Sequence, residues 1–398
     1  MCRLPRRETF AAAVALLLTV AGCGAPAVQQ AAPSPSPSPS SPVNAGSPTG
    51  PRAFTLVATG DVLPHTEIIQ QAKEDAGGSG YDFGKMLAGV KSVVSAADLA
   101  ICHMETVYGA DGGPFTGYPS FKSPPQVARA LKDVGYAACD TASNHTLDDG
   151  PNGIRRTLDA MDAVGLKHTG SARSEDEAAR PALLTAGGAT VAQLAYTYGT
   201  NGIALPKGQP WAVNLIDRDR ILADARAARA AGADIVVVSV HWGTEWQDEP
   251  NAQQLTLARE LAAEQGEGGP AVDLILGTHA HIPQAYEKIN GTWTVYGMGD
   301  QLAGHMFNYT GAEDPRGNWS SIARFTFSPP ARPGQRWTVS KAEFVPQLTD
   351  LGPPYRVLDL AEAVRRNPDR ADFARALDHI RSVVLSRGGA SAGLTMAP

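Results

Sequence analysis

Two histidines, His279 and His281, follow Leu274 to Leu276, an apolar segment with the composition of a buried strand. In an extended chain, residues i and i+2 face the same way, so the two imidazoles would be directed into one small volume. Imidazole is the commonest protein ligand for zinc-like metals. Because a single His-x-His also arises by chance, the motif alone leaves metal binding and a pair of satisfied surface histidines equally open.

Four further segments place potential ligands or acid–base groups after apolar runs. They contain Asp61 with His65, Glu105, Asn144 with His145, and His241 with Glu245. A lone histidine at a strand end is more often structural, but this recurrence at the carboxyl ends of strands favours one shared site. Carboxylate, imidazole and amide ligands suit Mn²⁺, Fe or Zn²⁺, and a carboxylate can bridge two ions that together promote hydrolysis of phosphate or amide bonds.

The elements that must position these residues alternate between strands and helices. Strands are predicted at 54–59, 98–102, 136–141, 234–240 and 272–276, and helices at 124–134, 151–163, 217–231 and 251–264. This alternation predicts an α/β protein with a largely parallel sheet and helices outside. Hairpins are predicted around Gly187-Gly188 and Asn290-Gly291, two more strands at 320–327 and 336–345, and a helical tail at 357–385.

The first residues have the layout of a secretory signal, with arginines before the apolar run Phe10 to Val20. Val20-Ala21-Gly22-Cys23 resembles a bacterial lipobox, which predicts removal of residues 1–22, lipidation of Cys23 and anchoring at the extracytoplasmic face of the membrane. An ordinary cleaved signal and, through Arg6-Arg7, a twin-arginine signal are the alternatives. The Pro/Ser-rich segment 23–52 is predicted to be a linker.

Charge and cysteine content narrow the class of protein. Removal of residues 1–22 takes three Arg and one Glu from a chain of net charge −6, which leaves −8 and argues against a nucleic-acid partner. Cys102 and Cys139 are then the remaining thiols besides Cys23; they could pair, but buried free thiols are the favoured prediction. The domain organisation expected is one domain over 53–348 with a helical tail, 349–398, packed on it.

Five motifs contain most of the potential ligands named above. They are Ala58-Thr59-Gly60-Asp61, Cys102-His103-Met104-Glu105, Ser143-Asn144-His145-Thr146-Leu147-Asp148, Val240-His241-Trp242-Gly243-Thr244-Glu245 and Gly277-Thr278-His279-Ala280-His281-Ile282-Pro283-Gln284. Taken together, they resemble the CapA family of capsule or poly-γ-glutamate synthesis proteins. The resemblance spans about Phe54 to Gly304. It implies a calcineurin-like metallophosphoesterase fold, an α/β/β/α sandwich of two mixed β-sheets flanked by helices.

The metallophosphoesterase pattern implies a centre of two divalent ions. The implied ligands are Asp61 and His281 on one ion, Asn144, His241 and His279 on the other, and Glu105 as the bridge. The pattern also implies that His145 is the general acid, with Asp148 orienting its ring.

Three further residues have open roles. The usual first motif has a histidine two residues after its aspartate, whereas His65 lies four after Asp61, so ligation by His65 is left open. Glu245 could ligate a metal, contact substrate or be a solvated loop carboxylate. Trp242 could form a wall of the pocket or pack beneath the loop.

The function expected from this resemblance is metal-dependent hydrolysis of phosphoester or γ-glutamyl bonds at the cell envelope. The alternatives are a non-catalytic anchored scaffold or polymer-binding component of a capsule synthesis and export complex, and a general exported phosphoesterase. The expected partners are an anionic envelope polymer or a small phosphoester or γ-glutamyl substrate, the membrane through the lipid anchor, and a capsule synthase complex.

Overall fold

The computed structural model describes residues 50–266, 269–332 and 334–397. The expected signal peptide, Cys23 and most of the linker therefore lie outside the described residues. Among the described residues, no helix combines the length and apolar character needed to cross a membrane.

The larger of two central sheets has the strand order β16-β15-β14-β1-β2-β3-β4. Its strands are β1 (Phe54–Val62), β2 (Leu99–Met104), β3 (Ala138–Asp140), β4 (Lys167–Thr169), β14 (Trp319–Ser328), β15 (Thr338–Asp350) and β16 (Arg356–Asp359), with β13 (Asp300–Leu302) paired to β1 and β17 (Leu394–Met396) paired to β15. β1 to β4 run parallel, whereas β14 is antiparallel to β1, β15 to β14 and β16 to β15. The sheet is therefore mixed.

The second sheet has the order β11-β12-β10-β7-β6-β5. Its strands are β5 (Ala182–Ala186), β6 (Ala189–Thr197), β7 (Ile235–His241), β10 (Leu274–Thr278), β11 (Tyr286–Ile289) and β12 (Thr292–Val295), and a separate small pair is formed by β8 (Gln265–Gly266) and β9 (Gly269–Pro270). The hairpins predicted around Gly187-Gly188 and Asn290-Gly291 are confirmed as the antiparallel pairs β5–β6 and β11–β12. The parallel core β6–β7–β10–β12 makes this sheet mixed as well.

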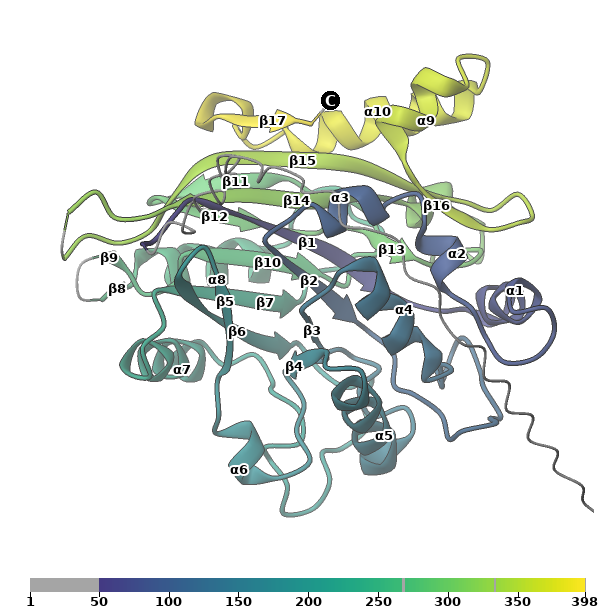
Figure 1. The fold of residues 1–398 in the computed structure, drawn as a ribbon, viewed down its shortest axis with the longest axis horizontal. Coiled ribbons are helices and arrows are strands. Elements are labelled where there is room, and N and C mark those ends of the chain that lie inside the picture. The colour runs from purple at the N-terminus through teal and green to yellow at the C-terminus, as the bar shows by residue number, and fades with distance from the viewer. Residues whose placement is uncertain (1–49, 267–268, 333, 398) are drawn as a thin grey trace, which may run out of the picture. The chain divides into compact units, whose positions relative to one another are not determined.

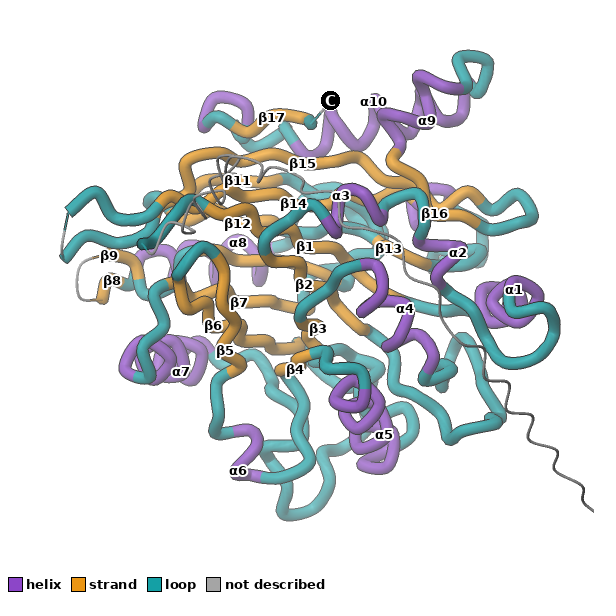
Figure 2. The backbone as a smooth tube through the Cα atoms, viewed as in Figure 1, coloured by secondary structure: helices purple, strands orange, loops and turns teal. Residues whose placement is uncertain are grey.

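Three apolar clusters define four layers (Figures 1 and 2). The helices are α1 (Thr66–Asp75), α2 (Gly84–Leu87), α3 (Lys91–Ser95), α4 (Gln126–Val134), α5 (Gly150–Ala163), α6 (Glu175–Ala178), α7 (Arg218–Ala230), α8 (Ala252–Ala263), α9 (Leu360–Arg366) and α10 (Ala371–Val384). One cluster lies between the two sheets and contains Leu56, Phe325 and Val237. The second joins α1 to α5 to the larger sheet, and the third joins α7 and α8 to the second sheet. The predicted α/β/β/α sandwich is confirmed.

The C-terminal residues are more closely integrated than a helical tail would be. The expected boundary at 348/349 falls inside β15. This strand pairs with β14 up to Leu348 and continues to Asp350 through its pairing with β16. Phe373 and Ile380 of α10 are buried in the cluster between the sheets. Figure 1 shows α10 and β17 lying beside β15.

Cys102 and Cys139 form a disulfide, so the prediction of buried free thiols is wrong. The two cysteines are directly opposite each other in the parallel pair β2–β3, with Cα atoms 4.4 Å apart. That separation lies at the short end of the range a disulfide needs. The sequence did not show that the two strands are neighbours in this register.

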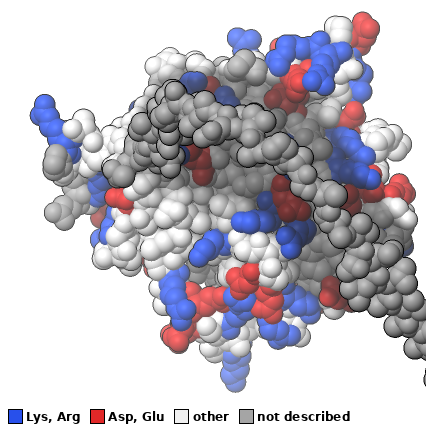
Figure 3. All heavy atoms as spheres, viewed as in Figure 1, with Lys and Arg blue, Asp and Glu red and all other residues white. Residues whose placement is uncertain are grey.

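Acidic and basic side chains are interspersed over the described surface of the face shown in Figure 3. On that face the described residues form no wide patch of one charge.

Candidate metal centre

The site is formed where parallel strands of both sheets end. Asp61 lies in β1, Glu105 directly follows β2, His241 ends β7 and His279 directly follows β10. Asn144 lies in the loop after β3. Gly60 and Gly277 allow the close packing here, because a Cβ on either would overlap the carbonyl oxygen of Gly299 or of Tyr296, respectively. The five strand ends that carry the predicted ligands thus come together.

Ligand atoms from these segments lie close to one another. His241 Nε2 is 3.0 Å from Asn144 Oδ1 and 3.7 Å from Glu105 Oε1, and His241 Nδ1 is 3.8 Å from Asp61 Oδ1. Three sets of side chains have ligand atoms within 4.8 Å of one another: Asp61, His103 and His241; Asp61, Glu105 and His281; and Glu245, His279 and His281. The third set brings together His279 and His281, which the sequence assigned to different ions. That assignment stays a prediction.

The cluster contains buried polar atoms that the protein itself does not satisfy. Asp61 Oδ1, both carboxylate oxygens of Glu105, His103 Nε2, His279 Nδ1 and Asp300 Oδ2 have no hydrogen-bond partner among the described residues. Burying an unpaired carboxylate costs several kcal/mol by general estimates, unless a cation compensates it. Divalent ions would provide that compensation, and the donor set of carboxylate, imidazole and amide oxygen suits Mn²⁺, Fe or Zn²⁺.

The pKa shifts of the buried carboxylates and of two histidines agree with a site for divalent ions. Burial raises the pKa of Asp61 and raises that of Glu105 well above its ordinary value, since Asp61 adds repulsion to Glu105. Burial and neighbouring histidines hold the pKa values of His241 and His279 well below the ordinary value. Low pKa values favour the neutral form of these two imidazoles, which is the form that binds metal. The pKa of His281 is instead raised, because burial is outweighed by the attraction of Asp300.

The backbone that carries His279 and His281 is not extended, so the extended conformation predicted there is wrong. β10 ends at Thr278, and His279 and His281 have φ angles of 89° and 60°, in a region that side-chain-bearing residues rarely adopt. His279 N donates to Asp61 Oδ2 at 3.2 Å, which helps to hold this conformation. Their rings still lie near each other, with centroids 6.0 Å apart. Such strained residues cluster at functional sites.

Two residues that the sequence analysis did not select, His103 and Asp300, belong to this cluster. His103 has Nδ1 hydrogen-bonded to Asp140 and Nε2 3.4 Å from Asp61 Oδ1. His281 Nδ1 is 3.0 Å from Asp300 Oδ1. Metal-binding histidines almost always pair their second nitrogen with a carboxylate, carbonyl or water. A signal for His103 was present, because it lies two residues before Glu105 at the end of a strand.

His145 and Asp148 form a hydrogen-bonded pair beside the cluster. His145 Nδ1 lies 2.7 Å from Asp148 Oδ2, and Asp148 Oδ2 also accepts from Phe121 N at 2.6 Å. Neither residue belongs to the three potential ligand sets. The geometry allows Asp148 to orient His145, and the general-acid role stays a prediction.

His65, Glu245 and Trp242, whose roles the sequence left open, lie in three different surroundings. His65 Nδ1 lies 3.0 Å from the carbonyl of Leu63, outside the potential ligand sets, and burial lowers the pKa of His65 to about 4. Glu245 belongs to the set with His279 and His281. Trp242 is fully buried in the apolar cluster that also contains residues of α7 and α8, and its Nε1 donates to the carbonyl of Tyr296. It does not line the cavity described below, which favours packing beneath the loop.

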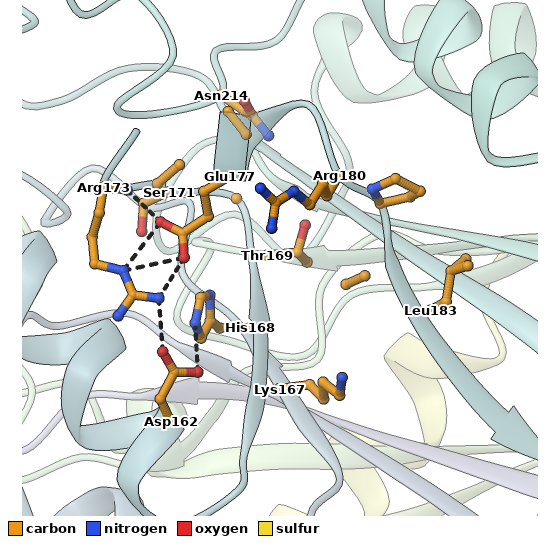
Figure 4. Close-up of a pocket in the computed structure, with 15 residues that line it drawn as sticks. Asp162, Lys167, His168, Thr169, Ser171, Arg173, Glu177, Arg180, Leu183 and Asn214 are labelled. Atoms are coloured by element: carbon orange, nitrogen blue, oxygen red, sulfur yellow. Dashed lines mark hydrogen bonds and ion pairs between the residues drawn. The ribbon is translucent and has the colours of Figure 1, made fainter. Parts of the chain in front are cut away.

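A cavity of about 830 Å³ opens beside the cluster. His65, His145, Glu245, Trp246 and His281 are among the residues that line it. A separate hollow of about 230 Å³ lies near β4 and α6 (Figure 4). There Arg173 pairs with Glu177 and Asp162, and no residue of the strand-end cluster lines that hollow.

Comparison with known proteins decides the family. The family model described as "Bacterial capsule synthesis protein PGA_cap" matches residues 55–305. The chain belongs to this family. The five motifs and the strand-end cluster lie within the matched residues, so the predicted recognition is confirmed.

Curated relatives resemble part of the chain. "PGA biosynthesis protein CapA" of Bacillus subtilis (strain 168) is 31% identical over 175 residues, which cover 43% of this chain and 44% of that protein. "Capsule biosynthesis protein CapA" of Bacillus anthracis is 26% identical over 179 residues, covering 44% and 42%. The chain thus matches less than half the length of these two relatives.

Solved structures show weaker likenesses. The calcineurin-like phosphoesterase YfkN from Bacillus subtilis has a TM-score of 0.43 and 14% identity, covering 83% of this chain and 100% of that chain. A putative 5'-nucleotidase from Staphylococcus aureus has a TM-score of 0.45 and 13% identity, covering 75% and 55%. Because both TM-scores are low, the description of this PGA_cap protein rests on its own strand order and layers.

Proposed function

We propose that this PGA_cap protein is a metal-dependent hydrolase of the cell envelope that acts on phosphoester or γ-glutamyl bonds. One observation carries the proposal: buried, unsatisfied ligand atoms from both sheets lie beside a His–Asp pair whose histidine lines a cavity. A structural cluster would require hydrogen-bond partners for the Glu105 oxygens. A hydrolytic centre requires them to be free for a cation.

The residues that would hold the ions are those with converging ligand atoms. They are Asp61, Glu105, Asn144, His241, His279 and His281, with His103 as an added candidate. Divalent ions bound there would polarise the scissile group and lower the pKa of a water molecule. Glu105 is suited to bridging, since both its carboxylate oxygens lack a protein partner.

His145 would protonate the departing group. Its Nδ1 proton would be held by Asp148, whose charge stabilises the imidazolium, and its Nε2 would donate toward the cavity. The Phe121 ring lies 4.8 Å from the His145 ring, centroid to centroid, and limits its rotation. These contacts support a fixed direction of proton transfer.

We also propose attachment to the outer face of the membrane through lipid on Cys23, near the machinery that makes the capsule polymer. The support is the lipobox-like Val20-Ala21-Gly22-Cys23 and the linker that follows it. Replacement of Cys23 by serine should move the protein from the membrane fraction to the soluble fraction. Retention of the Cys23→Ser variant in the membrane would contradict the anchor.

The hydrolase proposal is tested by turnover with a panel of phosphoesters and γ-glutamyl peptides at defined Mn²⁺ or Zn²⁺. We expect hydrolysis by the wild type and a loss of at least about a hundredfold in kcat/KM for Glu105→Gln, which keeps the side-chain size but removes the charge. Asp219→Asn, in an exposed part of α7, is the matched control. Two equivalents of bound metal without turnover of any substrate would favour the anchored scaffold instead.

A further inference from the structure

The cavity beside His145 indicates which kind of ester the proposed hydrolase would accept. This inference rests on the proposed function, because the group that His145 protonates must lie within its reach. His145 and His281 both line the cavity of about 830 Å³, so the cavity would hold the leaving group while the reacting bond lies toward the strand-end cluster. The volume is in the range of small-molecule pockets, about 300–1,000 Å³.

Exposed aromatic rings gather around this cavity. The exposed aromatic side chains of the described residues are Tyr118 at 77%, Tyr198 at 41%, Phe307 at 58% and Tyr309 at 67%. Three of them line the cavity, and Tyr198 lies over the His279 ring with centroids 4.4 Å apart. Large apolar groups left in water and gathered at one opening are typical of a ligand-binding surface.

Among the described residues, carboxylates line the cavity without a lysine or arginine to balance them. Glu67 and Glu245 line it, whereas its lining, all within the described part of the chain, includes no lysine or arginine. Four histidines also line the cavity: His65, whose pKa burial lowers to about 4, His145, His305, and His281, which is one of the proposed metal ligands. The hollow in Figure 4, by contrast, is lined by Lys167 and Arg180 as well as carboxylates.

Aromatic faces and carboxylates select the same kind of ligand. The face of an aromatic ring is the negative end of its quadrupole, so it attracts an ammonium group, and a nearby carboxylate strengthens that attraction. Both features repel a carboxylate such as the one carried by each unit of a γ-linked glutamate polymer.

We propose that the cavity binds the ammonium-bearing alcohol portion of a phosphoester. Water would add to phosphorus, the bond from phosphorus to the alcohol oxygen would break, and that oxygen would receive the proton from His145. The products are the amino alcohol and phosphate, so no further reactant is required. A polyanionic chain would be excluded from the cavity.

Three phosphoesters of similar size but different charge test this. They are phosphocholine, its neutral isostere 3,3-dimethylbutyl phosphate, and the phosphate ester of 3-hydroxypropionate. Binding to the metal-loaded protein is measured by calorimetry, and turnover by phosphate release. We expect phosphocholine to bind about tenfold more tightly than the neutral ester, and the anionic ester to bind most weakly.

Two variants assign the preference to the cavity. Phe307→Ala removes an exposed ring, and Glu67→Gln removes a charge but keeps the oxygen that accepts from His305 N. Each should bring the phosphocholine preference down severalfold, whereas Leu215→Ala, an exposed side chain outside the cavity, should leave it unchanged. Melting temperatures check that each variant is folded.

The outcomes separate this inference from the proposed function. Turnover of all three esters without the expected order, or an unchanged order in Phe307→Ala, would overturn the cavity inference alone. Binding in the expected order without any turnover would overturn the hydrolase proposal and leave the cavity preference standing. Absence of measurable binding, or displacement of phosphocholine by poly-γ-glutamate, would also overturn the cavity inference.

Discussion

Replacing Asp148 by asparagine tests whether His145 acts as a proton donor. Asp148 Oδ2 lies 2.7 Å from His145 Nδ1 and accepts from Phe121 N at 2.6 Å. Asparagine keeps the shape and a carbonyl acceptor but removes the negative charge that stabilises the imidazolium. A hydrogen bond to a charged group contributes about 1.5–3 kcal/mol, and about 1.4 kcal/mol is a tenfold rate change, so kcat/KM should fall by about 10- to 150-fold.

The assay for this prediction compares two leaving groups. An alkyl phosphoester needs a proton on its departing oxygen and should suffer the full loss, whereas p-nitrophenolate departs without one and should suffer a much smaller loss. Asp219→Asn serves as the control, and melting temperatures of both variants verify folding. An equal loss with both esters would assign Asp148 a structural role, and no loss with either would refute the reasoning about the His145–Asp148 pair.

Three further predictions concern stability. Gly277→Ala should lower the free energy of unfolding, measured by denaturant titration, by about 1–3 kcal/mol, because its Cβ would overlap the Tyr296 carbonyl. Gly199→Ala has open space around it and should be near neutral in the same titration. Equal effects of the two substitutions would contradict the role of close packing at Gly277. Replacing both Cys102 and Cys139 by alanine should cost up to about 4 kcal/mol, the chain-entropy value for a separation of 37 residues, and a loss under 1 kcal/mol in oxidising buffer would contradict a closed disulfide. Burial raises the pKa of Glu343, but hydrogen bonds from Lys341 and Arg324 outweigh it and hold the pKa below its ordinary value of 4.5. The wild type should therefore exceed Glu343→Gln in stability most above pH 4.5, and this difference should shrink as the pH falls through the native pKa. A difference that does not depend on pH would contradict this.

The fold was predictable where the sequence has a strong local signal. Ile235 to Val238 is a β-branched run buried on both faces, and the structure confirms it as part of β7. The hairpins follow from Gly187-Gly188 and Asn290-Gly291, which supply turns that favour positive φ. The strands that alternate with helices along the chain are expected to run parallel, so the meeting of their carboxyl ends at one site also followed from the sequence.

The details that depend on tertiary context were not predictable. The positive φ of His279 and His281 is held by contacts with residues far along the chain, such as Asp61, more than 200 positions earlier. The hydrogen bond of His103 to Asp140 depends on the pairing of β2 with β3, which the sequence did not reveal. Asp300 joins the site through β13, a short strand with weak local propensity that pairs beside Asp61.

Metal binding by the purified protein tests the central claim most directly. Mn²⁺ or Zn²⁺ would be titrated into the metal-free wild type, and bound metal counted by elemental analysis. We predict two equivalents for the wild type, loss of at least one in Asp61→Asn and in His103→Ala, and an unchanged count in the exposed-surface control Asp219→Asn. A wild type that binds no divalent ion, or the same count in Asp61→Asn as in the wild type, would contradict a metal centre at the ends of these strands.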